Sequence, residues 1–199
     1  MDLFNGSNNL LPYDGEAIYL GPVFSRQEAD EYYQMLLHEI PWEHDQVNLF
    51  GKRITTKRKV AWYGDQAFTY TYSKVTKTAK IWTEGLRALK NKIEVEADCN
   101  FNSCLLNFYH SGNEGMAWHS DAEKELLKHG TIASLSFGAS RKFSFKHKES
   151  QFKQDLVLEH GSLLLMKGSI QDHWLHRLPP TKKVHYPRIN LTFRTIKTS

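Results

Sequence analysis

The second half of the chain is divided into short apolar segments, and this feature constrains the fold most. The segments are four to seven residues long, which suits strands better than helices, and glycines or polar residues separate them. They are Cys104 to Tyr109, Ile132 to Phe137, Arg141 to His147, Leu156 to Glu159, Ser162 to Met166 and Ile189 to Arg194. The pattern is typical of an all-β sandwich or barrel.

Two helices are predicted ahead of this β-rich half. Ser25 and Glu28 form a capping-box pattern, which predicts a helix from Ser25 to about residue 40. A second helix is predicted over about 78–95, because apolar residues recur there at helical spacing. These residues are Trp82, Leu86, Leu89 and Ile93. Residues 1–16 are expected to be a loose arm, and no linker interrupts 1–199, so we predict a single, mainly β domain with flanking helices.

Composition excludes some classes of protein. Hydrophobic residues make up 40% of the chain, enough for a sizeable core, but no apolar run approaches the roughly 18 residues of a membrane span. Cys99 and Cys104 are too few for a disulfide framework, and the N-terminus shows no secretory signal. We expect a monomeric intracellular protein without a membrane partner, in the cytoplasm of a bacterium or the nucleus of a eukaryote. The net charge of +4 permits an anionic partner without requiring one.

The motif His119-Ser120-Asp121 is a candidate metal site. Residues i and i+2 of a strand share a face, so the imidazole and the carboxylate can converge on one ion. His176 is the candidate third ligand, and His173 is its rival. Two histidines and one carboxylate form the facial triad typical of non-haem iron(II) oxygenases. By itself the motif is weak, since a surface hydrogen-bonding pair has the same spacing.

A second candidate site lies near the C-terminus, where residues 188–194 read as a strand. Even spacing places Arg188, Asn190, Thr192 and Arg194 on one face. Two inward-facing cations are costly to bury unless an anion meets them, and a dicarboxylate suits the guanidinium fork. The alternative is a solvated face whose arginines pair with Asp or Glu.

Together these motifs resemble the AlkB family of Fe(II)- and 2-oxoglutarate-dependent dioxygenases. The resemblance covers about residues 45–196 and is most similar in motif to the human member that prefers double-stranded DNA. It includes the H-x-D motif, the distal histidine and the R-x-N-x-T-F-R strand in the family's order. Further agreements are Asn107-Phe108-Tyr109, Glu159-His160-Gly161-Ser162-Leu163 and His176-Arg177-Leu178-Pro179.

The resemblance implies a fold, a set of cofactors and a reaction. The fold would be a double-stranded β-helix (jelly-roll) core of two antiparallel sheets, with a nucleotide-recognition lid at about 45–75. His119, Asp121 and His176 would hold Fe(II), and O2 and 2-oxoglutarate would be co-substrates. The residues implied for 2-oxoglutarate are Asn107, Tyr109, Arg188, Asn190 and Arg194. The reaction would be oxidative demethylation of 1-methyladenine- and 3-methylcytosine-type bases in DNA, with release of formaldehyde, succinate and CO2.

A basic segment supports a nucleic-acid partner. No acidic residue occurs between Gln46 and Gly64, and five basic residues crowd into eight positions among aromatic ones. They are Lys52, Arg53, Lys57, Arg58 and Lys59. Basic residues that neutralise phosphates, interleaved with aromatics, suit nucleic-acid binding, although a solvated basic hairpin would look the same.

The resemblance also implies contacts to a flipped base. Leu49, Phe50 and Gly51 would form a wedge that fills the gap in the duplex, although Leu49 replaces a β-branched residue of the family. The other implied contacts are Arg58, Tyr70, Tyr72, Ser73 and Glu123. The expected substrate is alkylated DNA, double- or single-stranded, with RNA as a further substrate.

Two other functions stay open at this point. One is an oxygenase of the same fold that acts on RNA, a protein or a small molecule. The other is a nucleic-acid-binding module that has lost the metal. The basic wedge segment argues against a protein or small-molecule substrate, and the intact H-x-D…H set argues against loss of the metal.

Overall fold

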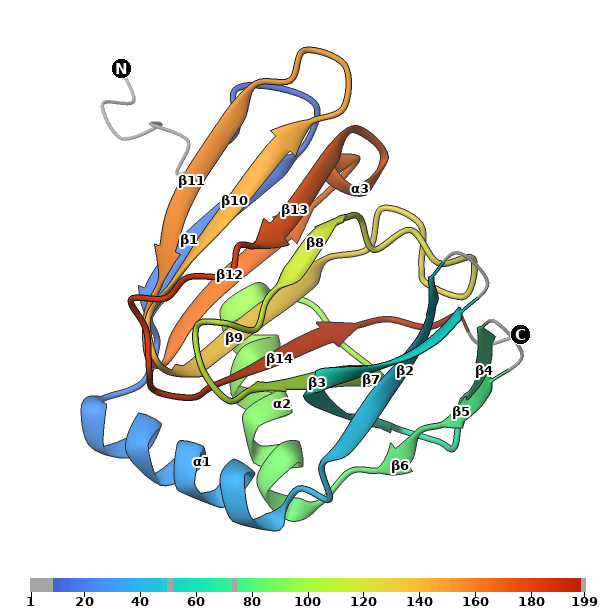
Figure 1. Ribbon diagram of the computed structural model, residues 1–199, viewed down its shortest axis with the longest axis vertical. Coiled ribbons are helices and arrows are strands. Elements are labelled where there is room, and N and C mark those ends of the chain that lie inside the picture. Colours follow the sequence, from blue (N-terminus) through green and yellow to red (C-terminus); the bar gives the residue numbers. More distant parts are fainter. Residues whose placement is uncertain (1–8, 50–51, 73–74, 198–199) are drawn as a thin grey trace.

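The computed structural model describes residues 9–49, 52–72 and 75–197 of the protein. Two antiparallel sheets form its centre (Figure 1). The larger sheet has the order β1-β12-β9-β14-β7-β3-β2, and β6 pairs in parallel with β3. Its strands are β1 (Glu16–Pro22), β2 (Glu43–Leu49), β3 (Lys52–Gly64), β6 (Lys80–Ile81), β7 (Ser103–Tyr109), β9 (Ile132–Gly138), β12 (Ser162–Lys167) and β14 (Arg188–Arg194).

The smaller sheet has the order β11-β10-β13-β8, and β4 and β5 form a separate ribbon. These strands are β8 (Met116–His119), β10 (Arg141–His147), β11 (Lys153–Leu158), β13 (Trp174–Leu178), β4 (Thr69–Tyr72) and β5 (Val75–Thr78). The helices are α1 (Arg26–Glu39), α2 (Glu84–Ala97) and α3 (Ile170–His173). The predicted mainly β fold, a jelly-roll core of two antiparallel sheets with flanking helices, is confirmed.

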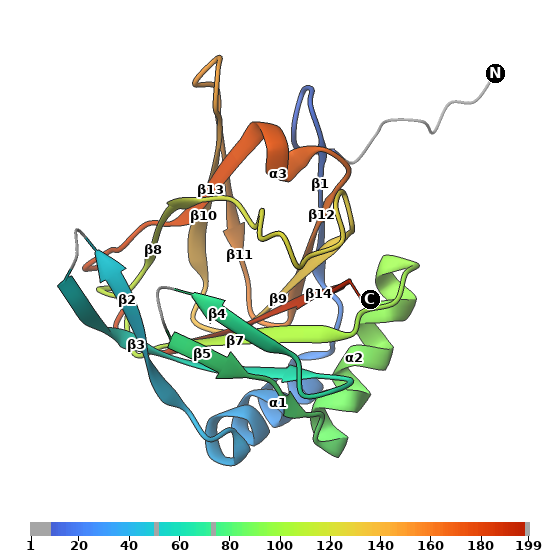
Figure 2. The ribbon, with the colours of Figure 1, turned by 90° about the vertical axis from the view of Figure 1, so that its right-hand side faces the viewer.

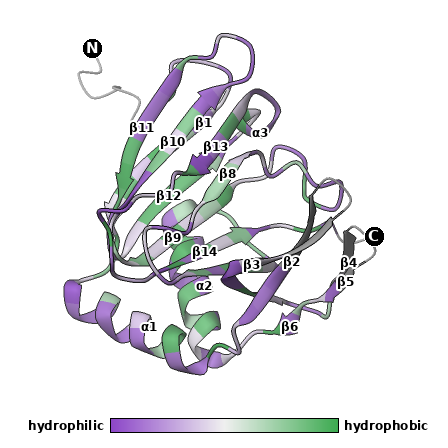
Figure 3. Cartoon of the chain, in the orientation of Figure 1, coloured by the Kyte–Doolittle hydropathy of each residue, from purple (hydrophilic) through white to green (hydrophobic). Residues whose placement is uncertain are grey.

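Two apolar cores hold these layers together. One lies between α1, α2 and the larger sheet, with Leu86, Leu106 and Leu191 fully buried. The other lies between the two sheets and contains Phe145 and Trp174. Figures 1 and 2 show both long helices on the side of the larger sheet that faces away from the smaller one. In Figure 3, α1 alternates between hydrophilic and hydrophobic residues, as expected of a helix with one face on a sheet.

The predicted helix starts are partly confirmed. Ser25 caps α1, because its Oγ accepts from the Glu28 amide at 3.3 Å while the Glu28 carboxylate accepts from the Ser25 amide at 2.9 Å. The second helix starts at Glu84 rather than near residue 78, so that part of the prediction was wrong. Thr83 caps it, and the preceding Lys80–Ile81 pairs with β3 instead of entering the helix.

The expectation of a loose arm over residues 1–16 is wrong for residues 9–16, while residues 1–8 lie outside the described part. The side chain of Asn9 accepts from the Ala17 amide at 2.8 Å, and Leu11 is 3% exposed. The buried indole of Trp174 donates to the carbonyl of Tyr13 at 3.1 Å. This N-terminal turn then continues into β1, which was not predicted. Within the described residues, no helix is long and apolar enough to cross a membrane.

We expect Gly15→Ala to lower the free energy of unfolding by about 2–4 kcal/mol, because strain and overlap act together. Gly15 has φ +136°, and an added Cβ would lie 2.6 Å from the Ile170 Cα. Gly21→Ala is the matched control: Gly21 has φ +71°, but a Cβ there would meet nothing within 4 Å. Urea denaturation measures both, and equal losses would contradict the proposed packing of the N-terminal turn on α3.

Candidate metal and co-substrate site

The H-x-D motif and His176 meet where β8 and β13 pair. His119 is the last residue of β8 and lies opposite His176 in the antiparallel register. Asp121 follows two residues later, beyond the end of the strand. One ligand atom from each of the three side chains lies within 4.8 Å of the other two, and the two imidazole centroids are 4.3 Å apart. The structure therefore brings together the three residues that were predicted as metal ligands.

The protonation of the three side chains suits a cation. The Nδ1 of His119 lies 2.8 Å from the carbonyl oxygen of Ala117, which can only accept, so Nδ1 carries a proton and Nε2 is the nitrogen left for a cation. Burial lowers the pKa of His176 to about 3, so this ring is neutral. Burial alone would raise the pKa of Asp121, but the positive charge of Arg194 is the largest opposing effect, and that pKa lies below its ordinary value.

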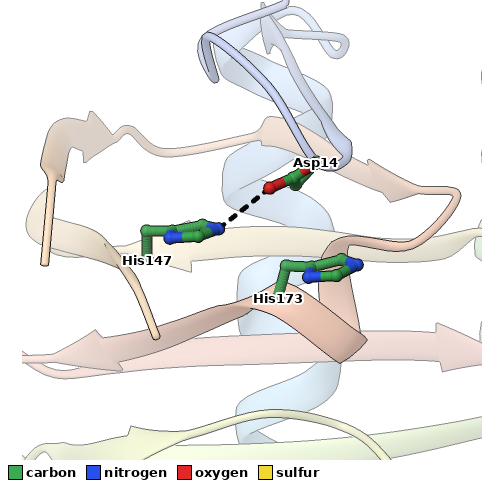
Figure 4. Close-up of side chains that lie close together, drawn as sticks. All are labelled: Asp14, His147 and His173. Carbon is green, nitrogen blue, oxygen red and sulfur yellow. Dashed lines mark hydrogen bonds and ion pairs between the residues drawn. The ribbon is translucent and has the colours of Figure 1, made fainter. Parts of the chain in front are cut away.

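His173, the rival third ligand, belongs to another cluster. It lies near Asp14 and His147 (Figure 4), and these three side chains also come within 4.8 Å of one another. The Ser150 amide donates to Nδ1 of His147 at 3.1 Å, so the proton of that ring is on Nε2, which donates to Asp14 at 3.1 Å. A metal-bound imidazole needs the opposite arrangement, with the second nitrogen donating. The hydrogen bond between His147 and Asp14 instead holds the N-terminal turn against the smaller sheet.

A cavity of about 150 Å³ opens beside the triad. The three triad side chains line it together with all five residues predicted to bind 2-oxoglutarate. Those five are Asn107, Tyr109, Arg188, Asn190 and Arg194. Even spacing along β14 therefore does turn its polar side chains inward, because Arg188, Asn190 and Thr192 are all less than 9% exposed. The alternative is wrong about a solvated face, but the pairing with acidic residues that it predicted does occur at Arg194.

Arg188 is a buried cation that lacks a carboxylate partner within the described part of the chain. It is 2% exposed, and its Nη2 donates to Ser136 Oγ at 2.9 Å and to Asn190 Oδ1 at 2.7 Å. Burial lowers its pKa to about 10, so the guanidinium remains charged near neutral pH. A buried charge of this kind is expensive unless an anion enters the cavity.

Arg194 has carboxylate neighbours. Its Nη1 lies 3.3 Å from Glu123 Oε1, and its Nη2 lies 3.9 Å from Asp121 Oδ1. Burial alone would lower the pKa of Arg194, but these two carboxylates outweigh it and hold that pKa above its ordinary value. Glu123, predicted to read the amino group of a base, is therefore paired with Arg194 here.

The hydroxyls that support Arg188 were not predicted. Ser134 and Ser136 both lie on β9, where Ser134 Oγ donates to Asn190 Oδ1 at 3.0 Å. Two serines at even spacing within an otherwise apolar strand were the available signal. Polar residues on the inward face of a buried strand need partners, and here the partners are the residues of β14.

The predicted base contacts are described only in part. Phe50, Gly51 and Ser73 lie outside the described residues. Leu49 ends β2 and Tyr70 and Tyr72 belong to β4, but their side chains are also outside the description. A groove of about 730 Å³ borders this region and shares Glu123 and Arg194 with the inner cavity. Side chains from β3, β5 and the segment after β14 line it: Trp62, Lys77 and Ile196.

Arg58 has a structural partner that was not predicted. Its Nη2 lies 2.9 Å from Asp45, whose carboxylate also pairs with Lys77, and the Arg58 side chain is only 12% exposed. Asp45 immediately precedes the segment without acidic residues, so the cluster is partly neutralised across the β2-β3 hairpin. A contact between Arg58 and the substrate stays a prediction.

We expect Arg58→Met to lower the free energy of unfolding by roughly 2–4 kcal/mol, because it breaks a largely buried ion pair. Lys59→Met, one position along the same strand, is the control and should change stability by less than about 0.5 kcal/mol. Denaturant unfolding gives both values. A stable Arg58→Met protein that has lost affinity for DNA would instead assign Arg58 to phosphate contact.

Comparison with known proteins agrees with this geometry. The profile of the 2OG-Fe(II) oxygenase superfamily matches residues 16–194. Human DNA oxidative demethylase ALKBH2 is 40% identical over 185 residues, covering 87% of this chain and 71% of that protein. The bovine protein of the same name is also 40% identical, with 66% of its length covered. Human alpha-ketoglutarate-dependent dioxygenase alkB homolog 3 is 38% identical over 182 residues, covering 85% of this chain and 62% of that protein.

A structural comparison shows the same fold. The solved structure of OsALKBH1 has a TM-score of 0.61 and 15% identity, and the match covers 93% of this chain and 98% of that one. The fold and the superfamily match together define a dioxygenase of the iron(II)- and 2-oxoglutarate-dependent class. Within that class, the chain belongs to the AlkB family.

Proposed function

We propose that this protein removes alkyl groups from bases of the 1-methyladenine and 3-methylcytosine type in DNA. The observation that carries the co-substrate assignment is the buried Arg188, which has no carboxylate partner among the described residues and lies in the cavity shared with His119, Asp121 and His176. Support for DNA comes from the relatives named DNA oxidative demethylase and from the basic residues along β3. The proposed substrate is double- or single-stranded DNA, with RNA as a further substrate.

Different side chains of the site would bind the metal and the co-substrate. His119, Asp121 and His176 would hold Fe(II), and a donor set of two imidazoles and one carboxylate fits that ion. With 2-oxoglutarate and O2, bound Fe(II) supplies the oxidant, and the products would be formaldehyde, succinate, CO2 and the restored base. Arg188 would bind the distal carboxylate of 2-oxoglutarate through charge-assisted hydrogen bonds from the guanidinium protons that Ser136 and Asn190 leave free. Arg194 would neutralise its iron-chelating end.

The remaining polar side chains orient the co-substrate. Asn107 is 5% exposed and lines the cavity, where its side-chain Nδ2 would donate to an oxygen of 2-oxoglutarate. Tyr109 and Asn190 line the same cavity. Glu123 lies between this cavity and the outer groove, where it could contact an exocyclic amino group of a flipped base.

A direct assay tests the proposal. Purified protein, Fe(II), 2-oxoglutarate and an oligonucleotide with one 1-methyladenine should release formaldehyde and succinate in equal amounts, in single- and double-stranded forms. The unmethylated oligonucleotide is the control. Succinate without formaldehyde on every methylated DNA and RNA would leave the dioxygenase class intact but reject the nucleic-acid substrate, which favours a protein or small molecule. Absence of metal binding would favour a metal-free binding module.

A further inference from the structure

The metal-ligand candidate Asp121 lies outside the strand ladder. β8 ends at His119, and among the described strands β8 pairs with β13 alone, at the edge of the smaller sheet. The backbone amide of Asp121 instead donates to the side-chain oxygen Oε1 of Gln171, at 2.9 Å. These two residues are 50 positions apart in the chain. The backbone of Asp121 is thus held by a side chain from another part of the fold.

Gln171 is well placed to orient Asp121. It belongs to α3, the short helix that leads directly into β13, and β13 carries His176. Ile170 anchors this helix at 2% exposure, and Lys148 Nζ donates to the carbonyl oxygens of Gln171 and Asp172 at 3.0 and 2.8 Å. One segment of about seven residues therefore positions two of the three candidate ligands, one through the backbone and one through a side chain.

A second contact braces the same loop. Asp172, the neighbour of Gln171, lies 2.8 Å from Nε2 of His129. Residues 120–131, which carry Asp121, are thus tied to α3 near both ends of the loop. The orientation of the Gln171 amide is also determined by its partners, because an N–H donor requires the oxygen, and the Nε2 end points to the sulfur of Met166 at 3.8 Å.

We propose that Gln171 is a positioning residue for the metal centre, which holds the Asp121 carboxylate toward His119 and His176. The inference rests on the metal assignment proposed above. Groups that orient metal ligands typically contribute 10- to 100-fold to metal affinity, because a misdirected ligand must reorder before it can bind. Without the Gln171 acceptor, the Asp121 peptide can rotate, and among the described residues its carboxylate keeps only the contact with Arg194 at 3.9 Å to direct it.

Three variants test the role of Gln171. Gln171→Met removes the acceptor at nearly constant volume, Gln171→Glu keeps an acceptor oxygen, and Gln154→Met changes a half-buried glutamine of β11 in the same way. Metal-free proteins are titrated anaerobically with Co(II), and binding is followed by its visible absorption. Gln171→Met should bind Co(II) about 10- to 100-fold more weakly than the wild type. Gln171→Glu should recover most of this loss, and Gln154→Met should bind as the wild type does.

Two further readouts separate positioning from folding. The Asp121 amide proton, followed by NMR, should exchange faster in Gln171→Met, and this measurement needs no metal. A merely structural role would lower the free energy of unfolding but leave the Co(II) affinity of the folded protein unchanged, and that result would overturn the inference. Equal weakening by Gln171→Met and Gln171→Glu would overturn it too. If the wild type itself fails to bind Co(II), the metal assignment fails first.

Discussion

Replacing His176 by alanine should reduce succinate and formaldehyde production on the order of a thousandfold, because one of three candidate metal ligands is lost. The ring is buried, neutral and opposite His119 in the strand register, so neighbouring side chains cannot substitute for it. Turnover at saturating Fe(II) and 2-oxoglutarate measures the effect. A Co(II) titration should show a parallel loss of metal affinity.

The matched control for this loss is His173→Ala. His173 lies three residues earlier in the chain and was the rival candidate, but the structure groups it with Asp14 and His147. Its replacement should leave turnover within about twofold of the wild type. Alanine at position 176 would also leave a cavity. His176→Gln fills more of that space, so it tests whether the loss of activity comes from the missing imidazole rather than from the cavity. Loss of activity in His173→Ala with retention in both His176 variants would show that the wrong histidine has been assigned.

Arg188→Met should raise the KM for 2-oxoglutarate on the order of a hundredfold or more, yet leave the free protein as stable as the wild type or more so. Truncating one partner of a buried ion pair costs about 2–5 kcal/mol of binding. Without a ligand, however, Arg188 is a buried charge that no carboxylate of the described residues neutralises. Replacing such a charge by an apolar side chain is often neutral or stabilising.

Arg141→Met is the contrasting variant. Arg141 is 1% exposed, and its guanidinium donates to backbone carbonyl oxygens, those of Ser111, Gly112, Glu114 and Pro179. Its loss should lower the free energy of unfolding by roughly 2–4 kcal/mol, because those carbonyls lose their donors. Urea unfolding without 2-oxoglutarate compares the two. If Arg188→Met is equally destabilised and keeps its KM, Arg188 is a structural residue.

The sequence alone predicted the features that depend on short-range chemistry. The capping box at Ser25 and Glu28, the inward face of β14 and the H-x-D spacing concern residues a few positions apart. Backbone geometry relates such residues in nearly the same way in any protein. The identity of the metal-ligand candidates was therefore available without coordinates, and the choice of His176 over His173 rested on family spacing.

Contacts between distant residues were decided only by the tertiary structure. The pairing of Arg58 with Asp45, the packing of residues 9–16 around Trp174 and the hydrogen bond from Asp121 to Gln171 connect segments 13 to 161 positions apart. Each depends on strand register and on how the two sheets stack, and many residues across the fold determine these jointly. Local propensity does not describe such contacts. The candidate metal and co-substrate residues could therefore be predicted from the sequence, whereas the residues that hold them in place could not.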